Sequence, residues 1–365
     1  MKSVVVPNTG NLKGIPAAVC AGVAFGNADK KLEVLSDIEE SEIPQISEYM
    51  SKTEIEVNHL KSGFNFDIIL TTVHGNDYSK IRITNSHTNI TLIEKNGEKL
   101  FEAKIRCESD EGFTDRSVLS GEAIWKYISE VDTEDIKPII KRQIEYNSAI
   151  AEEGLKNDYG ASIGKVILKA YGNNVRDRAK AMAAAGSDAR MNGCELPVII
   201  NSGSGNQGMT CSLPVLEYAK ELKSSEDKLY RALALSNLIA IHIKSGIGRL
   251  SAYCGAVSAG AAAGAGIAYL YTEDYKTVMH TVVNALGIVS GIICDGAKAS
   301  CAAKIASSVD AGILGFDMYM QGKQFVSGDG IVAKAFEANV KNIGRLGKTG
   351  MKTTDAEILE MMLNS

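Results

Sequence analysis

The chain has 365 residues, of which 45% are hydrophobic, enough to bury the apolar cores of two domains. Charged residues make up 23% of the chain and leave a net charge of −5. This composition argues against wholesale disorder and against nucleic-acid binding, because phosphate contacts need clustered Lys and Arg. The seven cysteines are an odd number, and only three consecutive valines precede Pro7, too few for a signal peptide. We therefore expect a cytoplasmic protein with reduced thiols.

The first part of the chain is expected to form helices followed by a small sheet. Helices are predicted near 15–26 and 42–51, and residues 1–51 are expected to pack on a helical domain further along the chain. Runs rich in β-branched residues predict strands over 54–60, 64–73, 80–84, 91–94 and 99–103. Asn96-Gly97 predicts a type I′ hairpin, because that turn needs positive φ at both central positions. Residues 52–114 are therefore predicted to be a small β-containing (α/β) domain.

From residue 115 to residue 365 the hydrophobic period becomes helical. Helices are predicted over 118–131, 136–153, 175–185 and 228–243. Ser224 is expected to cap the last of these, with Asp227 in its first turn. The predicted fold class is α+β, with a helix-rich domain packed with a smaller β-containing domain. Neither a dinucleotide-binding GxGxxG nor a phosphate-binding GxxxxGK[ST] motif is present in its required context.

One uncharged stretch, 250–272, is long enough to span a bilayer. Within 254–270, however, 11 of 17 residues are Gly or Ala, which supply little hydrophobic transfer energy. The next uncharged stretch, 277–294, contains His280 and Asn284. A buried, tightly packed helix pair is therefore favoured over a membrane hairpin, and no membrane partner is expected.

Three cysteines, Cys254, Cys294 and Cys301, lie in this small-residue part of the chain. In one unbroken helix the last two would lie about 10.5 Å apart, which is long for one metal cluster. Asp295 is expected to be an N-cap, so that Cys294 precedes a helix whose positive end favours the thiolate. Ordinary buried thiols are one interpretation. The other is an iron–sulfur cluster with one open iron, since a closed zinc site normally needs a fourth ligand.

A glycine-rich loop, 201–208, follows an apolar run. Its backbone amides and polar side chains can bind an anion, and the absence of Lys favours a carboxylate over a triphosphate. A turning connector is the alternative interpretation. The predicted substrate-binding residues of this loop are Ser202, Gly203, Ser204, Gly205 and Asn206. Lys244 and Arg249, ahead of Cys254, either solvate a helix end or hold the carboxylate.

His87 lies between two predicted strands in Ser86-His-Thr-Asn-Ile90. It is either a donor or proton-transfer group facing a cleft or an ordinary strand-end histidine. We predict it as the catalytic candidate, although nothing in the sequence fixes the base.

Five segments together resemble the iron–sulfur L-cysteine desulfidases, relatives of the iron–sulfur L-serine dehydratases. The segments are SVVVPNTGNLKG (3–14), SHTNITLIEKNGE (86–98), NSGSGNQGMTCSLPV (201–215), IKSGIGRLSAYCGAVSAGAAAGAG (243–266) and CDGAKASCAAK (294–304). The resemblance implies a 4Fe-4S cluster held by Cys254, Cys294 and Cys301, and conversion of L-cysteine to pyruvate, ammonia and sulfide. The helical domain, 115–365, would then be the cluster-binding catalytic domain. We expect substrate contacts from Asn8, Thr9, His87, Thr88 and Asn89, which lie in the first two segments.

The chain departs from this family's pattern because it carries no Gly-Cys-Thr-Glu-Pro motif, whose cysteine is thought to act in catalysis. The chain thus resembles a family member that lacks its beginning, so we expect impaired turnover and an exposed apolar surface that favours a homodimer. Cys107 lies in a charged sequence and is not expected to be a ligand. Two other functions remain open: L-serine dehydration to pyruvate and ammonia, and a non-catalytic metabolite-binding remnant.

Overall fold

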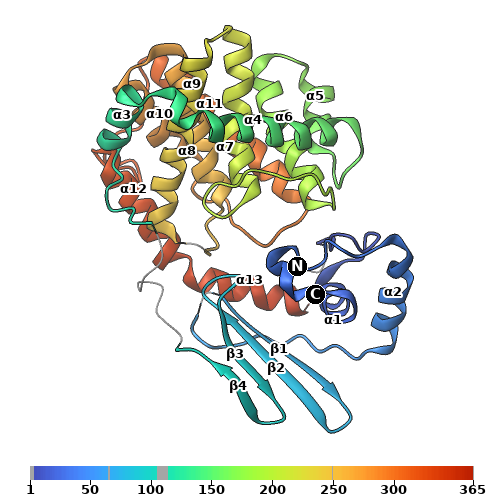
Figure 1. Ribbon diagram of the computed structural model, residues 1–365. Coiled ribbons are helices and arrows are strands. Elements are labelled where there is room, and N and C mark those ends of the chain that lie inside the picture. Colours follow the sequence, from blue (N-terminus) through green and yellow to red (C-terminus); the bar gives the residue numbers. More distant parts are fainter. Residues whose placement is uncertain (1–3, 65, 105–113, 249, 365) are drawn as a thin grey trace. The chain divides into compact units, whose positions relative to one another are not determined.

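A computed structural model describes residues 4–64, 66–104, 114–248 and 250–364 (Figure 1). Its contacts divide the chain into two units. The larger unit contains the described residues of 116–358 with Val4 and Val5, and the smaller contains those of 6–115 with 359–364. The larger is helical and the smaller carries an antiparallel sheet, which confirms the helix-rich α+β class.

The smaller unit combines two short helices with a four-stranded meander (Figure 1). Its elements are α1 (Gly14–Phe25), two 3-10 turns (Ala28–Glu33 and Glu40–Glu42), α2 (Ile43–Lys52), β1 (Asp67–His74), β2 (Asp77–Thr84), β3 (Ile90–Lys95) and β4 (Glu98–Glu102). Cys20, Ala21 and Ile46 form a small core between the helices. The strand predicted over 54–60 is wrong, because the structure has no strand there and no described segment pairs with it. That residues 1–51 pack on the helical domain stays a prediction.

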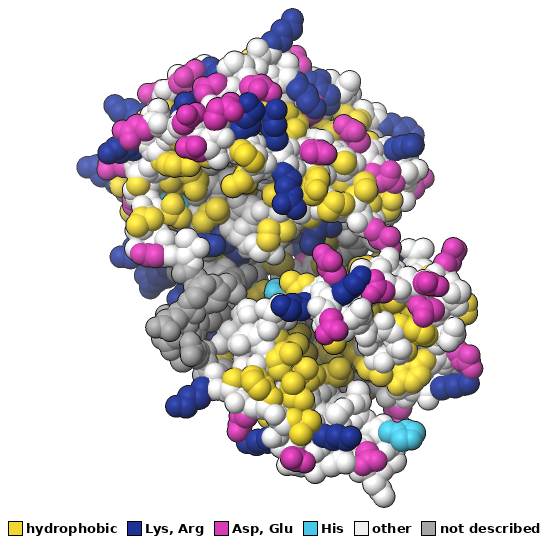
Figure 2. Space-filling model, in the orientation of Figure 1, with side chains coloured by type: hydrophobic (Ala, Val, Ile, Leu, Met, Phe, Trp, Pro, Cys, Tyr) yellow, Lys and Arg dark blue, Asp and Glu magenta, His cyan; other side chains and the backbone are white. Residues whose placement is uncertain are grey.

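The predicted Asn96-Gly97 hairpin is confirmed. β3 and β4 pair antiparallel, and φ is +49° at Asn96 and +85° at Gly97, as a type I′ turn requires. Asn96 also accepts a hydrogen bond from the Tyr78 backbone N–H at 2.7 Å, which ties the turn to β2. Hydrophobic side chains gather on the surface of this unit (Figure 2), and Val73, Leu100 and Phe101 are among its exposed apolar residues.

The larger unit is a bundle of helices. They are α3 (Gly121–Glu130), α4 (Thr133–Lys156), α5 (Ile163–Tyr171), α6 (Val175–Met191), α7 (Gly205–Leu222), α8 (Glu226–Ile247), α9 (Gly255–Thr272), α10 (Tyr275–Val289), α11 (Ser300–Met320), α12 (Phe336–Arg345) and a π turn (Leu346–Gly350). The last helix, α13 (Lys352–Asn364), begins in the larger unit, and its residues from 359 onward are assigned to the smaller one. The four helices predicted over 118–131, 136–153, 175–185 and 228–243 are confirmed as α3, α4, α6 and α8. Ser224 is not the cap of α8; Ser225 accepts the hydrogen bond from the Lys228 N–H at 3.3 Å.

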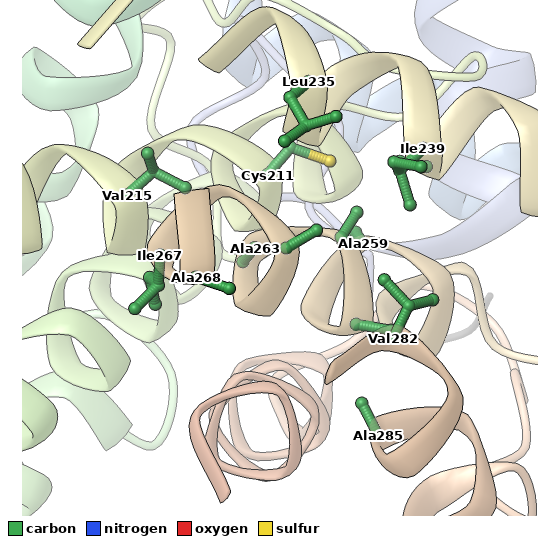
Figure 3. Packing of buried hydrophobic residues seen from close by; sticks show 14 of the residues in the cluster. Cys211, Val215, Leu235, Ile239, Ala259, Ala263, Ile267, Ala268, Val282 and Ala285 are labelled. Carbon is green, nitrogen blue, oxygen red and sulfur yellow. The ribbon is translucent and has the colours of Figure 1, made fainter. Parts of the chain in front are cut away.

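Helix α9 lies at the centre of the bundle, in contact with α7, α8, α10 and α11. Ala259, Ala263 and Ile267 of α9 belong to one buried hydrophobic cluster with Leu235 of α8 and Val282 of α10 (Figure 3). The uncharged stretches therefore form the expected buried helix pair, α9 and α10. In the described part of the chain, no helix is long and apolar enough to cross a membrane.

Glycines let α9 and α11 approach backbone to backbone. A Cβ atom added to Gly312 would lie 2.3 Å from the Gly260 carbonyl oxygen, and one added to Gly264 would lie 2.6 Å from the Gly312 carbonyl oxygen. Real Cβ atoms do not come this close to backbone, so the crossing tolerates only glycine at these positions.

Gly312→Ala is expected to destabilise the larger unit by about 1–3 kcal/mol, because overpacking forces two helices apart. Gly291→Ala is the matched control, since a Cβ atom there meets nothing within 4 Å. Chemical denaturation should show a lower midpoint for Gly312→Ala alone. Equal midpoints for both variants would contradict the close crossing.

Candidate functional site

Cys254 and Cys294 are held side by side by backbone pairing. Cys254 directly precedes α9, and Cys294 follows α10. Tyr253 and Ile293 form an antiparallel bridge, the Cys254 N–H donates to the Ile292 carbonyl at 3.2 Å, and the Cys294 N–H donates to the Ala252 carbonyl at 2.6 Å. The fully buried Tyr253 anchors this pairing. The positions of these two thiols are therefore fixed by the main chain.

The two thiols share one proton unequally. The Cys254 thiol donates a hydrogen bond to Cys294, which lowers the pKa of Cys294 to about 6. The Gly296 N–H and the cations of Lys244 and Lys304 support the Cys294 thiolate, whereas burial opposes it. The same hydrogen bond and burial raise the pKa of Cys254. Cys294 is therefore the first of the pair to ionise.

Cys301 lies in the first turn of α11, and its thiol donates to the Gly296 carbonyl at 3.6 Å. The prediction that Asp295 caps a helix is wrong, because α11 begins at Ser300. The Asp295 carboxylate instead accepts ion pairs from Lys298 and Lys304. These ion pairs hold together the segment between α10 and α11 that contains Cys294.

The three thiols are suitable ligands for an iron–sulfur cluster, but their arrangement in this structure is not that of a cluster site. Soft thiolates are the ligands that such clusters take. Cys254 contacts Cys294, and Cys301 lies within electrostatic range of Cys254. Within the described residues, however, no three His, Cys, Asp or Glu side chains are grouped closely enough to hold a metal ion as they stand. A cluster would require Cys301 to leave the Gly296 carbonyl.

The glycine-rich loop forms a tight, hydrogen-bonded turn, as the alternative interpretation of a turning connector also expects. Asn201 and Ser204 exchange backbone hydrogen bonds at 3.1 and 3.0 Å, and the Asn201 amide binds Asn237 of α8. Ser202 has φ of +49°, and its hydroxyl donates to Asn201 Oδ1 at 2.9 Å. Ser204 caps α7, where its oxygen accepts from the Gln207 N–H at 3.5 Å. Gly203 has φ of +81°. These hydrogen bonds thus fix the position of the N-terminus of α7.

This N-terminus lies beside the cysteines. Gln207 packs directly against Gly255, so that a Cβ atom there would lie 2.5 Å from its Cδ. Asn206 accepts a hydrogen bond from Arg190 of α6 at 3.3 Å, and Arg190 interacts electrostatically with Cys301. Gln207 and Arg190 are candidate site residues that the sequence did not single out. Gln207 lies within the glycine-rich loop's sequence, but nothing near Arg190 signals a site.

Lys244, near the end of α8, is only 6% exposed. Burial lowers the pKa of its ammonium group, against the opposing influence of Cys294 and Cys254. Lys244 is therefore a buried cation within electrostatic range of Cys294, Cys254 and the Asp355 carboxylate. Arg249 and Cys107 lie outside the described residues.

The other predicted site residues belong to the smaller unit. Asn8 donates to the Leu35 carbonyl at 3.0 Å, and the buried Thr9 donates to the Val6 carbonyl at 2.8 Å. His87 is exposed in the turn between β2 and β3, with its ring 4.9 Å from that of Phe66. Thr88 is exposed beside it, and Asn89 closes the turn by donating to the Thr84 carbonyl. Their roles toward substrate stay predictions.

The chain belongs to the serine dehydratase alpha chain family, whose model matches residues 29–360. It is 58% identical over 364 residues to a UPF0597 protein of Desulfitobacterium hafniense, covering 100% of this chain and 85% of that protein. It is 51% identical over 363 residues to a UPF0597 protein of Lachnoclostridium phytofermentans, covering 100% of this chain and 87% of that protein. No solved structure matches the chain.

The hydrogen bond from Cys254 to Cys294 leads to a prediction for the metal-free protein. Alkylation of Cys294 by iodoacetamide should accelerate as the pH rises through about 6, because the thiolate is the nucleophile. Cys254→Ala removes the donor and should move this inflection to higher pH. Cys301→Ala should leave it in place. Peptide mass spectrometry across pH measures the rates, and an unmoved inflection in Cys254→Ala would refute the shared hydrogen bond.

Proposed function

We propose that this protein is a 4Fe-4S-dependent lyase that converts L-cysteine to pyruvate, ammonia and sulfide. The observation that carries the proposal is the meeting of Cys254 and Cys294 across one backbone bridge, with Cys301 at the adjoining helix start. Family membership supports a dehydratase-type elimination, and the resemblance to cysteine desulfidases supports the thiol substrate.

Cys254, Cys294 and Cys301 would hold the cluster. When bound, the cluster would supply a Lewis-acidic iron that improves the β-substituent as a leaving group. Lys244 would offset the negative charge of the thiolates from its buried position. The loop residues Ser202 to Asn206, beside Cys254, would orient the substrate.

The reaction needs one proton removed and one group lost. A base takes the Cα proton, the Cβ–S bond breaks with its electron pair leaving on sulfur, and sulfide departs. The aminoacrylate that forms tautomerises to an imine, which water hydrolyses to pyruvate and ammonia. His87 is our candidate for the base, and Asn8, Thr9, Thr88 and Asn89 for further substrate contacts.

L-Serine dehydration is the second candidate, favoured by the family to which the chain belongs. The same three cysteines and the same proton abstraction would serve, with hydroxide in place of sulfide as leaving group. Anaerobic reconstitution followed by sulfide and pyruvate assays on both amino acids separates the two functions. Cluster uptake without pyruvate from either amino acid would favour a non-catalytic metabolite-binding protein.

Serine at any of positions 254, 294 and 301 should abolish the stable cluster, because a hydroxyl is a poor ligand where iron prefers thiolate. Cys194→Ser is the matched control, since Cys194 is a half-buried thiol outside the cysteine site and should not affect iron content. Iron and sulfide analysis with visible absorption measures the loss. Full iron content in Cys254→Ser, Cys294→Ser or Cys301→Ser would remove that residue from the ligand set.

A further inference from the structure

Arg190 differs from the other cations of α6 in what it binds. Arg176 pairs with Asp310 and Asp317, Arg178 with Glu217 and Glu221, and Lys180 with Asp177 and Asp310. Within the described part of the chain, Arg190 pairs with no carboxylate and instead donates to the neutral Asn206 amide. Its guanidinium has five donors, so most of its capacity for an anion is left over. We therefore expect the unpaired guanidinium of Arg190, within electrostatic range of Cys301, to bind an anionic ligand.

The start of α7 is shaped to receive this guanidinium. A Cβ atom added to Gly205 would lie 2.5 Å from Arg190 Nε and 3.0 Å from Arg190 Cδ. The glycine therefore leaves the space that the arginine fills. Asn206 Oδ1, 3.3 Å from one guanidinium nitrogen, fixes its direction. The fork of Arg190 is thus preorganised against the loop that precedes α7.

Gln207 offers a hydrogen-bond acceptor where Arg190 offers donors. Its side chain is 6% exposed, and its Oε1 atom has no hydrogen-bond partner. The side chain lies against Gly255, the residue that follows Cys254. A buried carbonyl oxygen without a donor is unfavourable, so a ligand that supplies an N–H group is expected there.

The serine hydroxyls of the loop are already engaged. Ser202 donates to Asn201, and Ser204 accepts from the Gln207 N–H. Neither is as free as Arg190 to bind a carboxylate. The strongest anion donor at this end of α7 is therefore the guanidinium.

We propose that Arg190 binds the α-carboxylate and Gln207 Oε1 accepts from the α-ammonium group of a zwitterionic amino acid whose short β-substituent faces the cysteines. This inference rests on the proposed function and names the groups that select its substrate class. Arg190 supplies charge-assisted, fork-shaped donors to the carboxylate. A ligand that carries the ammonium group supplies the hydrogen bond that Gln207 Oε1 lacks.

Two analogues test the assignments separately. 3-Mercaptopropionate keeps the carboxylate and thiol but lacks the ammonium group, and cysteamine keeps the ammonium and thiol but lacks the carboxylate. Calorimetric titration of the anaerobic, reconstituted protein measures both dissociation constants. Arg190→Gln should weaken 3-mercaptopropionate about 10- to 100-fold and leave cysteamine unchanged. Gln207→Leu should weaken cysteamine about 10-fold and leave 3-mercaptopropionate unchanged.

Arg178→Gln is the matched control on the same helix, because Arg178 is paired with two glutamates; both analogues should bind it as they bind wild type. Arg190→Lys keeps the charge without the fork and should weaken 3-mercaptopropionate less than Arg190→Gln does. If Arg190→Gln fails to fold, as judged by iron content and melting temperature, Arg190→Lys becomes the test variant. Binding of 3-mercaptopropionate that is equal in wild type and both Arg190 variants would overturn the carboxylate assignment.

The outcome is separable from that of the proposed function. Pyruvate formation by the wild type reports on elimination alone. A wild type that forms no pyruvate contradicts the proposed function, whatever the analogues do. A wild type that forms pyruvate, with variants that affect both analogues alike, contradicts the inference about Arg190 and Gln207.

Discussion

The close contact between α9 and α11 is the constraint on which the cysteine site depends. The two helices touch through glycine backbone, so their register is fixed to within a residue. An offset of 48 positions relates Gly260 to Ser308 and Gly264 to Gly312. The same offset places Cys254 level with Ala302, the neighbour of Cys301. Glycines that carry no chemistry thus place Cys254 and Cys301 at the same end of the two helices.

The third thiol, that of Cys294, is positioned by α10, the helix between α9 and α11 in the chain. Only two residues connect α9 to α10, which makes the two contacting helices antiparallel neighbours. The chain therefore returns at Val289 to the end where α9 began, and the bridge between Tyr253 and Ile293 joins the two segments. The start of α9, the end of α10 and the start of α11 share one end of the bundle. Cys254, which is distant in sequence from the other two cysteines, is thereby brought to the same end of the bundle as Cys294 and Cys301.

Local signals were sufficient for part of this structure. Asn96-Gly97 specifies its turn through the backbone angles of two residues, so the hairpin could be predicted without knowledge of the rest of the fold. Two other predictions were wrong because tertiary contacts decided them. Residues 54–60 have strand propensity but no strand to pair with, and Asp295 is used by the ammonium groups of Lys298 and Lys304 and not by a helix start.

The cap of α8 shows the same limit on a smaller scale. Ser224 and Ser225 are equivalent as residue types, and only the final position of the Lys228 N–H selects Ser225. Arg190 was missed for a stronger reason. On α6 it follows three cations at earlier positions that all form ion pairs, and sequence alone cannot tell which arginine lacks an acid. That distinction arises from tertiary packing.

The charges around the cysteines explain why this end of the bundle favours anions. Lys298 and Lys304 are neutralised by Asp295, and Lys244 lies within electrostatic range of the Asp355 carboxylate, whereas Arg190 has no ion-pair partner among the described residues. A buried or half-buried cation without a counter-ion costs stability, so its retention is difficult to explain by folding alone. Thiolates would offset Lys244, which lies within electrostatic range of Cys254 and Cys294. They would not saturate Arg190, whose planar donors suit a carboxylate better than a single sulfur. The site therefore has room for two kinds of negative charge, one from its own cysteines and one from a ligand.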